Sequence, residues 1–196
     1  MFYNRLNQQR RRVSQLIGLM GGIVLAAVLI CCTVVAADDL SDIARMDKEG
    51  FVHFKVGKAA AGEKEYDQAA QEFTQAIDKW ESAYELCGEV YCWEEEGWVE
   101  WDVSNRLAEA YALRAAVFGM LKDLDRAERD AKSSITYNEY YALPHVILAS
   151  IYIQKGEEKL ARSEYNVLKD DLGMLDAAER ILRAINEKFP PSAKTK

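Results

Sequence analysis

A repeated helical pattern constrains the fold of this chain more than any other feature of the sequence. Segments beginning at Glu65, Asp123 and Glu157 each contain a small residue, followed four and seven positions later by small or apolar residues. Spacings of four and three place such positions on one face of a helix. The shared positions are Ala69, Phe73 and Ala76; Ala127, Ala131 and Ser134; and Ala161, Tyr165 and Leu168.

A second helical pattern precedes each of these segments and has its own small residue, which is Gly57, Ala115 or Ala149. A small residue lets two antiparallel helices approach closely, as ridge-and-groove packing requires. Polar and charged stretches separate the two patterns in every case and are typical of turns. The sequence therefore predicts three helical hairpins.

Ala127 and Ala161 are 34 residues apart. This period and the small-residue pattern resemble the tetratricopeptide repeat family, and the resemblance covers residues 50–173. It implies an all-α fold in which about three hairpins stack into a short right-handed solenoid. A closing helix is expected over residues 175–189, because its apolar stripe would cover the open face of the last repeat.

The resemblance also implies that the first helix of each hairpin lines a concave binding groove. Lys58 is the one basic residue at these positions and no asparagine is among them, so the groove differs from the clamp with which some family members hold a carboxylate. A groove of this kind suits an amphipathic helix or an extended apolar segment. The positions are Phe51, Phe54, Lys58, Ala112, Ala116, Met120, Val146, Ser150 and Ile153.

An uncharged apolar run over residues 16–37 is long enough, at 1.5 Å per residue, to cross a hydrocarbon layer of about 30 Å. Four arginines precede this run and acidic residues follow it. The positive-inside rule then predicts a transmembrane signal anchor, with a cytoplasmic N-terminus and a periplasmic or equivalent body. A bacterial inner membrane is favoured over a mitochondrial inner membrane or the secretory pathway. A signal peptide cleaved after Ala37 is the alternative, because small residues there fit a peptidase site.

Small residues recur every four positions in the predicted span, at Gly18, Gly22 and Ala26. Such a stripe allows the backbone of another membrane helix to approach closely. It predicts lateral packing in the bilayer, although the ordinary abundance of Gly and Ala in spans explains it equally well.

The distance from Ala69 to Ala127 is 58 residues, which places an insertion over residues 81–104 between the first two repeats. All four tryptophans lie in or beside it. Two interpretations stay open: the rings form a recognition element, because Trp and Tyr are enriched at binding hot spots, or they fill the gap between separated repeats. The candidate contact residues are Tyr91, Trp93, Trp98 and Trp101.

Cys87 and Cys92 lie five positions apart in the insertion, which does not match the spacing of zinc or redox motifs. Outside the cytoplasm, a disulfide between them is the natural outcome. His53 and His145 complete no metal set with them, so no metal or cofactor is expected. His145 follows a proline at the predicted start of a helix and is expected at the surface.

The net charge of −7 conceals a division, because residues 1–37 carry four arginines and no acid. The remainder has 21 basic and 32 acidic residues, a net charge of −11. Such a body would repel phosphate backbones and shows no basic stripe, which excludes nucleic acid as a partner. No phosphate-binding loop, nucleophile elbow or zinc-binding helix is present, so enzymatic turnover is not expected.

Together these patterns predict a basic stub and anchor over 1–37, a linker over 38–49, a repeat domain over 50–189 and a tail over 190–196. The expected function is a membrane-anchored scaffold, an accessory or assembly subunit of a membrane complex. Its partners would be protein subunits, including membrane-embedded ones, and the bilayer through residues 16–37, with no small-molecule substrate. The alternative is a chaperone-like factor that binds exported or unfolded chains near a translocon.

Overall fold

The computed structural model describes residues 23–90 and 97–190, and for residues 23–38, 40, 88–90 and 97–102 it describes the backbone alone. All elements in these ranges are helices, which confirms the predicted all-α solenoid for the described part of the chain. The chain divides into two compact units, Met1–Asp42 and Ile43–Lys196, and the division falls inside the first described helix.

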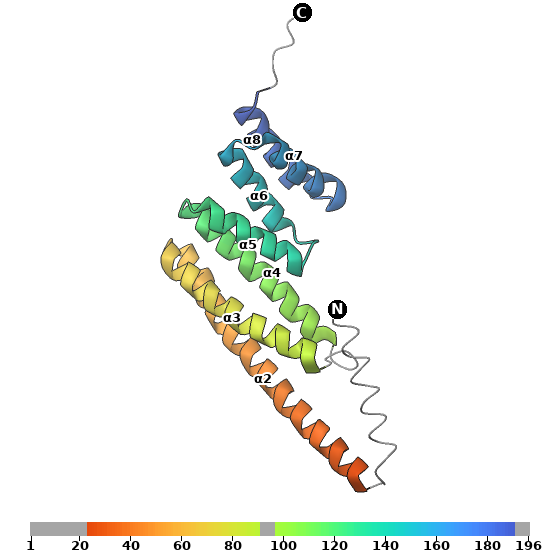
Figure 1. Cartoon of the computed structure of the whole chain (residues 1–196). Coiled ribbons are helices and arrows are strands. Elements are labelled where there is room, and N and C mark those ends of the chain that lie inside the picture. The colour runs from red at the N-terminus through yellow and green to blue at the C-terminus, as the bar shows by residue number, and fades with distance from the viewer. Residues whose placement is uncertain (1–22, 91–96, 191–196) are drawn as a thin grey trace, which may run out of the picture. The chain divides into compact units, whose positions relative to one another are not determined.

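Three hairpins and a final helix make up the second unit (Figure 1). The C-terminal half of α2 (Ile23–Gly62) pairs with α3 (Tyr66–Val90), and α4 (Gly97–Met120) pairs with α5 (Leu124–Tyr137). The third hairpin joins α6 (Ala142–Lys155) to α7 (Glu158–Asn166), which continues as a π-helical turn, η1 (Val167–Asp171). The series closes with α8 (Leu175–Lys188).

The three hairpin turns share one backbone geometry. One residue in each turn, Lys64, Lys122 or Gly156, has a positive φ of 66°, 65° or 80°. The next residue donates its backbone N–H to a carbonyl five positions earlier, as when Glu157 donates to Tyr152 at 2.8 Å. This bond satisfies a carbonyl at the helix end that would otherwise lack a partner. The repeat seen in the sequence therefore extends to the turns.

A close approach of α2 and α3 sets the packing of the first hairpin. Trp80 of α3 is fully buried, and its Nε1 donates to the backbone oxygen of Asp47 at 3.2 Å and to its Oδ1 at 3.1 Å. The indole lies over Gly50, where an added Cβ would be 2.7 Å from Nε1. Gly57 similarly meets the ring of Phe73, with 3.0 Å left for a Cβ. Both glycines are required by contact with an aromatic ring.

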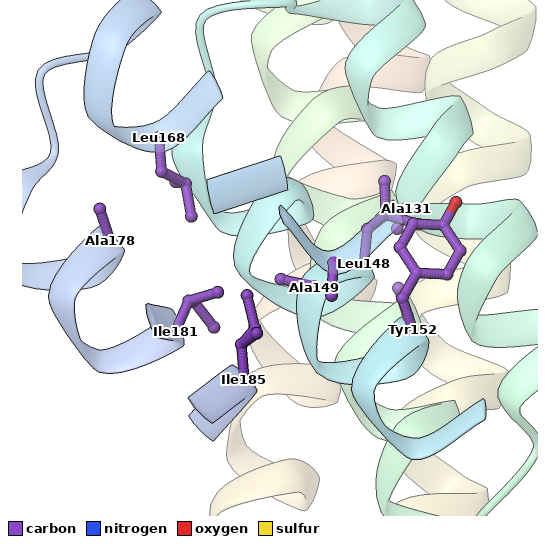
Figure 2. Close-up of a cluster of buried hydrophobic side chains, with 10 residues drawn as sticks. Ala131, Leu148, Ala149, Tyr152, Leu168, Ala178, Ile181 and Ile185 are labelled. Carbon is purple, nitrogen blue, oxygen red and sulfur yellow. The ribbon is translucent and has the colours of Figure 1, made fainter. Parts of the chain in front are cut away.

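The last hairpin and α8 enclose a second apolar cluster. Leu168, Ala178, Ile181 and Ile185 are all buried. Figure 2 shows Ile181 and Ile185 of α8 pointing toward Leu168 of η1 and Ala149 of α6. Burial of this apolar stripe explains why α8 packs on the third hairpin.

The predicted linker and the predicted insertion are both helical where the structure describes them. Residues 38–49, expected as a linker, are part of α2, and Ile43 is buried. The stretch contains no Gly or Pro before Gly50 to end a helix, and Asp47 is held by the Trp80 indole. Residues 81–90 continue α3 and residues 97–104 belong to α4, so the described parts of the insertion are helical.

The predicted membrane span is described in part. Residues 16–22, including Gly18 and Gly22, lie outside the described residues, whereas Ala26 belongs to α2. Within the ranges that the structure describes, no helix is both long enough and apolar enough to cross a membrane.

The close approach at Gly50 leads to a first prediction. Replacing Gly50 with Ala should lower the free energy of unfolding by about 1–3 kcal/mol, because the added methyl group overlaps the Trp80 indole. The matched control is Gly119→Ala in α4, where a Cβ would meet no atom within 4 Å. That change should be neutral or raise stability by up to about 1 kcal/mol. Chemical denaturation measures both, and equal effects would contradict the proposed steric role of Gly50.

Candidate functional site

The first helices of the three hairpins are neighbours in the structure. Lys58 of α2 donates from Nζ to Glu109 Oε1 of α4 at 3.4 Å, and Arg106 of α4 pairs with Asp47 of α2. Helix α4 in turn contacts α6. These helices therefore present one continuous surface, the groove face, which is defined here by the exposed and half-buried residues of α2, α4 and α6 at the predicted groove positions.

Seven of the nine predicted groove residues are solvent-accessible on this face. Phe51 is 40% exposed and Met120 is 62% exposed. Lys58 is also exposed. The others are half-buried, and they are Ala116, Val146, Ser150 and Ile153.

Phe54 and Ala112 correct the predicted groove, because both are core residues. Ala112 is fully buried and Phe54 is 6% exposed. The Phe54 ring lies 5.8 Å from that of Phe73 and 5.4 Å from that of Trp80, measured between centroids. Phe54 therefore packs on the second helix of its own hairpin, and neither buried residue is available to a partner.

The groove face is bordered by charged residues that its predicted positions did not include. Lys58 forms an ion pair with Glu109, and its Nζ lies 5.2 Å from the centre of the Phe54 ring. Two other cations lie over Phe51, with Lys55 Nζ at 4.3 Å and the Arg106 guanidinium at 5.6 Å. Glu109 and Arg106 were missed by sequence reasoning, because no local pattern joins residues more than 50 positions apart.

The insertion is bonded to the second hairpin through a tyrosine cluster. Glu81 Oε1 accepts from the hydroxyl of Tyr111 at 2.5 Å and from that of Tyr137 at 3.2 Å. Tyr84 meets the Tyr137 ring edge-on at 5.5 Å, and Tyr111 stacks on it at 5.8 Å. Burial, with the carboxylate of Glu81 beside it, raises the pKa of Tyr137 to about 12. The phenols are therefore neutral donors that fix the start of the insertion.

The predicted aromatic contacts of the insertion fall largely outside the described side chains. Tyr91 and Trp93 lie outside the described residues, and for Trp98 and Trp101 the structure describes the backbone of α4 alone. Trp80, at the edge of the insertion, is a core residue of the first hairpin.

Cys87 is buried and disulfide-bonded. Cys92 lies outside the described residues, so the predicted pairing of these two cysteines stays a prediction.

One acidic position repeats in the second helix of every hairpin and was not singled out in the sequence. Ala69, Ala127 and Ala161 occupy the same position in the repeat. Three residues after them lie Glu72, Asp130 and Glu164 respectively. Each accepts from the first helix of its own hairpin. The donors are His53 Nδ1 at 2.8 Å, the Arg114 guanidinium at 2.6 and 3.0 Å, and His145 Nδ1 at 2.7 Å. The constant offset from the alanine was the signal that could have revealed this position.

His145 differs from its expected surface location, because it is buried and its side chain is 8% exposed. Its Nδ1 bonds Glu164, while its Nε2 has no hydrogen-bond partner. In the described residues, no group of three or more His, Cys, Asp or Glu side chains is arranged to hold a metal ion.

Ion pairs also join the second and third hairpins. Lys155 of α6 donates to Asp125 Oδ1 and Glu128 Oε2 of α5, both at 2.8 Å. Lys132 donates to the other oxygen of Glu128 at 2.6 Å. Hydrogen bonds from Lys132 and then Lys155 lower the pKa of Glu128 to about 2.

The buried pair of Arg114 and Asp130 provides a test of the hairpin contact. Asp130→Ala should lower the free energy of unfolding by about 3 kcal/mol, because Arg114, 14% exposed, would lose its counter-charge. The control is Asp125→Ala in the same helix. Its carboxylate is 88% exposed, so its loss should cost less than about 1 kcal/mol. Thermal or urea unfolding measures both, and a similar loss for the two variants would contradict this role of the buried pair.

The lowered pKa of Glu128 predicts a pH dependence. Its pKa in the folded state lies below the ordinary value, so its stabilising effect is present above about pH 4.5 and is lost as the pH falls toward 2. Glu128→Gln should therefore cost about 1 kcal/mol at pH 7 and much less at pH 3. Urea unfolding at both pH values tests this, with Glu187→Gln on α8 as the control. A cost for Glu128→Gln that does not change with pH would refute the interpretation.

Comparisons with known proteins identify no family. No protein-family model matches the sequence, and no curated protein sequence matches it. Among solved structures, the chain is similar to the one described as "Crystal structure of MamA protein", with 14% identity and a TM-score of 0.30. That match covers 72% of this chain and 92% of the other. At this level the likeness carries no argument about function, and the description of the fold rests on the hairpins themselves.

Proposed function

We propose that this protein is a protein-interaction scaffold of the tetratricopeptide type, anchored in a membrane, that acts as an accessory or assembly subunit of a membrane protein complex. The observation that carries the proposal is the groove face. Three first helices lie side by side and expose Phe51 and Met120, at 40% and 62%, in a face that also holds exposed Lys58 and four half-buried residues. Accessible large apolar side chains on a preformed surface are typical of sites that bind a partner.

The chemistry of the groove face suits an apolar segment better than a charged terminus. Lys58 is paired with Glu109 and Arg106 with Asp47, so these two cations already have acidic partners. Phe51 offers an aromatic contact surface and Met120 a flexible apolar one. An amphipathic helix or extended apolar segment of another subunit is therefore the proposed ligand. The mechanism is binding without turnover, and no cofactor is part of it.

Membrane attachment belongs to the same proposal and is supported by the sequence. The run of residues 16–37 is uncharged, with four arginines before it and Asp38 and Asp39 after it. This layout favours a cytoplasmic N-terminus and a body on the periplasmic or equivalent side. The stripe of Gly18, Gly22 and Ala26 would then pack against a membrane-embedded subunit.

The test combines native extraction with a groove variant. The membrane of the producing cell is extracted in mild detergent, and native mass spectrometry identifies what travels with the chain and whether its N-terminus is intact. A fixed set of partners is expected. The double variant Phe51→Ala, Met120→Glu should reduce their recovery about tenfold, as expected when an interface loses large apolar contacts.

The control is Leu160→Glu, which changes an exposed apolar residue of α7 outside the groove face and should leave recovery unchanged. A varied set of weakly held clients would favour the chaperone-like alternative. A chain that begins at Asp38, or one that travels alone, would refute the anchored-subunit proposal.

A further inference from the structure

The outer face of α2 corresponds to surfaces that are buried in the other two hairpins. Val52 is 56% exposed and Val56 is 39% exposed. The residues 58 and 92 positions after Val52, at the same place in the repeat, are Ala110 and Pro144, and both are buried. This side of a first helix is therefore normally covered.

The cover in the internal hairpins is the second helix of the preceding hairpin. Arg114, the counterpart of Val56 in α4, donates to Thr74 of α3 at 2.9 Å. Leu148, the counterpart in α6, lies in one buried cluster with Ala131 of α5. Because α2 belongs to the first hairpin, the described residues 43–90 and 97–190 provide no preceding helix for its outer face. We call this surface the end face, defined as Lys48, Val52, Lys55, Val56 and Ala59.

The charge of the end face is opposite to that of the acidic body. Four basic residues of α2 between Ile43 and Gly62 are exposed, and they include Lys48 and Lys55. The two acids of the same stretch are engaged elsewhere, with Asp47 bound to Arg106 of α4 and Glu49 bound to Lys79 of α3 at 2.7 Å. The end face is thus an apolar stripe with cations beside it.

We propose that the end face binds an amphipathic helix of a partner protein, which places an apolar stripe on Val52 and Val56 and acidic residues opposite Lys48 and Lys55. A helix is the fitting shape, because α3 and α5 occupy the corresponding face of α4 and α6. Acidic flanks are the fitting chemistry, because complementary charge sets the choice and register of a partner. The partner helix would continue the solenoid by one layer.

Charge argues against the chain's own segments as occupants. Residues 1–22 contain four arginines and no acid, and residues 191–196 contain two lysines and no acid, so both would be repelled. A second copy docked through its own end face would oppose lysine to lysine. Three acids and three bases are exposed on α8, so it carries no net negative charge, and Leu175 is its one large exposed apolar residue, so it offers no apolar stripe.

The experiment uses the full chain in the cells that produce it. A photo-crosslinking amino acid replaces Val52, and the crosslinked peptide is sequenced by mass spectrometry. We expect one partner segment with helical apolar spacing and a net negative charge. The variant Lys48→Glu, Lys55→Glu should lower the crosslink yield at least tenfold. The control Lys159→Glu, Lys188→Glu changes two exposed lysines elsewhere and should leave it unchanged.

A photo-crosslinker in place of Leu175, exposed on α8, should not capture the same segment. The single groove variant Met120→Glu, which leaves the contact between Phe51 and Lys55 unchanged, should leave the crosslink at position 52 intact, so that a failure of the groove proposal and a failure of this one are distinguishable. Crosslinking to this chain, to a second copy, to lipid, to a segment without acidic amphipathic character, or to nothing would overturn the proposal.

Discussion

The close approach of two helices inside each hairpin is the constraint on which the rest of the structure depends. In the first hairpin it is most demanding, because Gly50 and Gly57 leave no room for a Cβ beside Trp80 and Phe73. Phe54 packs against both of these rings in the same cluster. In the other two hairpins alanine suffices at the Gly57 position, since Ala115 and Ala149 are both fully buried. Tight hairpins are what allow successive first helices to align as a surface.

Electrostatics adds specificity to this packing. The acid at the same place in each second helix accepts from a donor of the first helix, which fixes how the two helices lie in register. The middle hairpin uses a bidentate arginine, and the outer two use histidines. Such contacts are worth most where both groups are shielded from water, as Arg114 and Asp130 are. Surface pairs such as Lys155 with Asp125 contribute less and chiefly link neighbouring hairpins.

The two ends of the solenoid differ in whether the apolar face of the terminal helix is covered. At the C-terminal end α8 buries Ala178, Ile181 and Ile185 and turns polar residues outward, as a capping helix does. At the N-terminal end, α2 exposes Val52 and Val56 between lysines. A repeat array stacks each layer on the next, so an uncovered apolar layer is a place where the stack can be extended by another protein. The groove face and the end face are then two separate surfaces of one scaffold.

The sequence by itself determined the all-α class, the three hairpins and the position of their turns, because spacing of small residues and polar turn residues are local signals. It also placed most of the groove face, since helical register follows from the same period. Only the tertiary structure decided which of those residues are accessible. Phe54, Ala112 and His145 were expected near solvent and are buried. Phe54 packs on α3 and His145 bonds Glu164 of α7, which are the second helices of their hairpins.

The charge of the groove face was likewise decided by tertiary structure, through the meeting of Lys58 with Glu109 across two helices. Within residues 38–49 of α2, Asp47 meets Trp80 and Arg106, which lie 33 and 59 residues away. Local patterns determine which segments form helices. Side-chain burial and ion pairing depend on contacts with segments that are distant in the sequence.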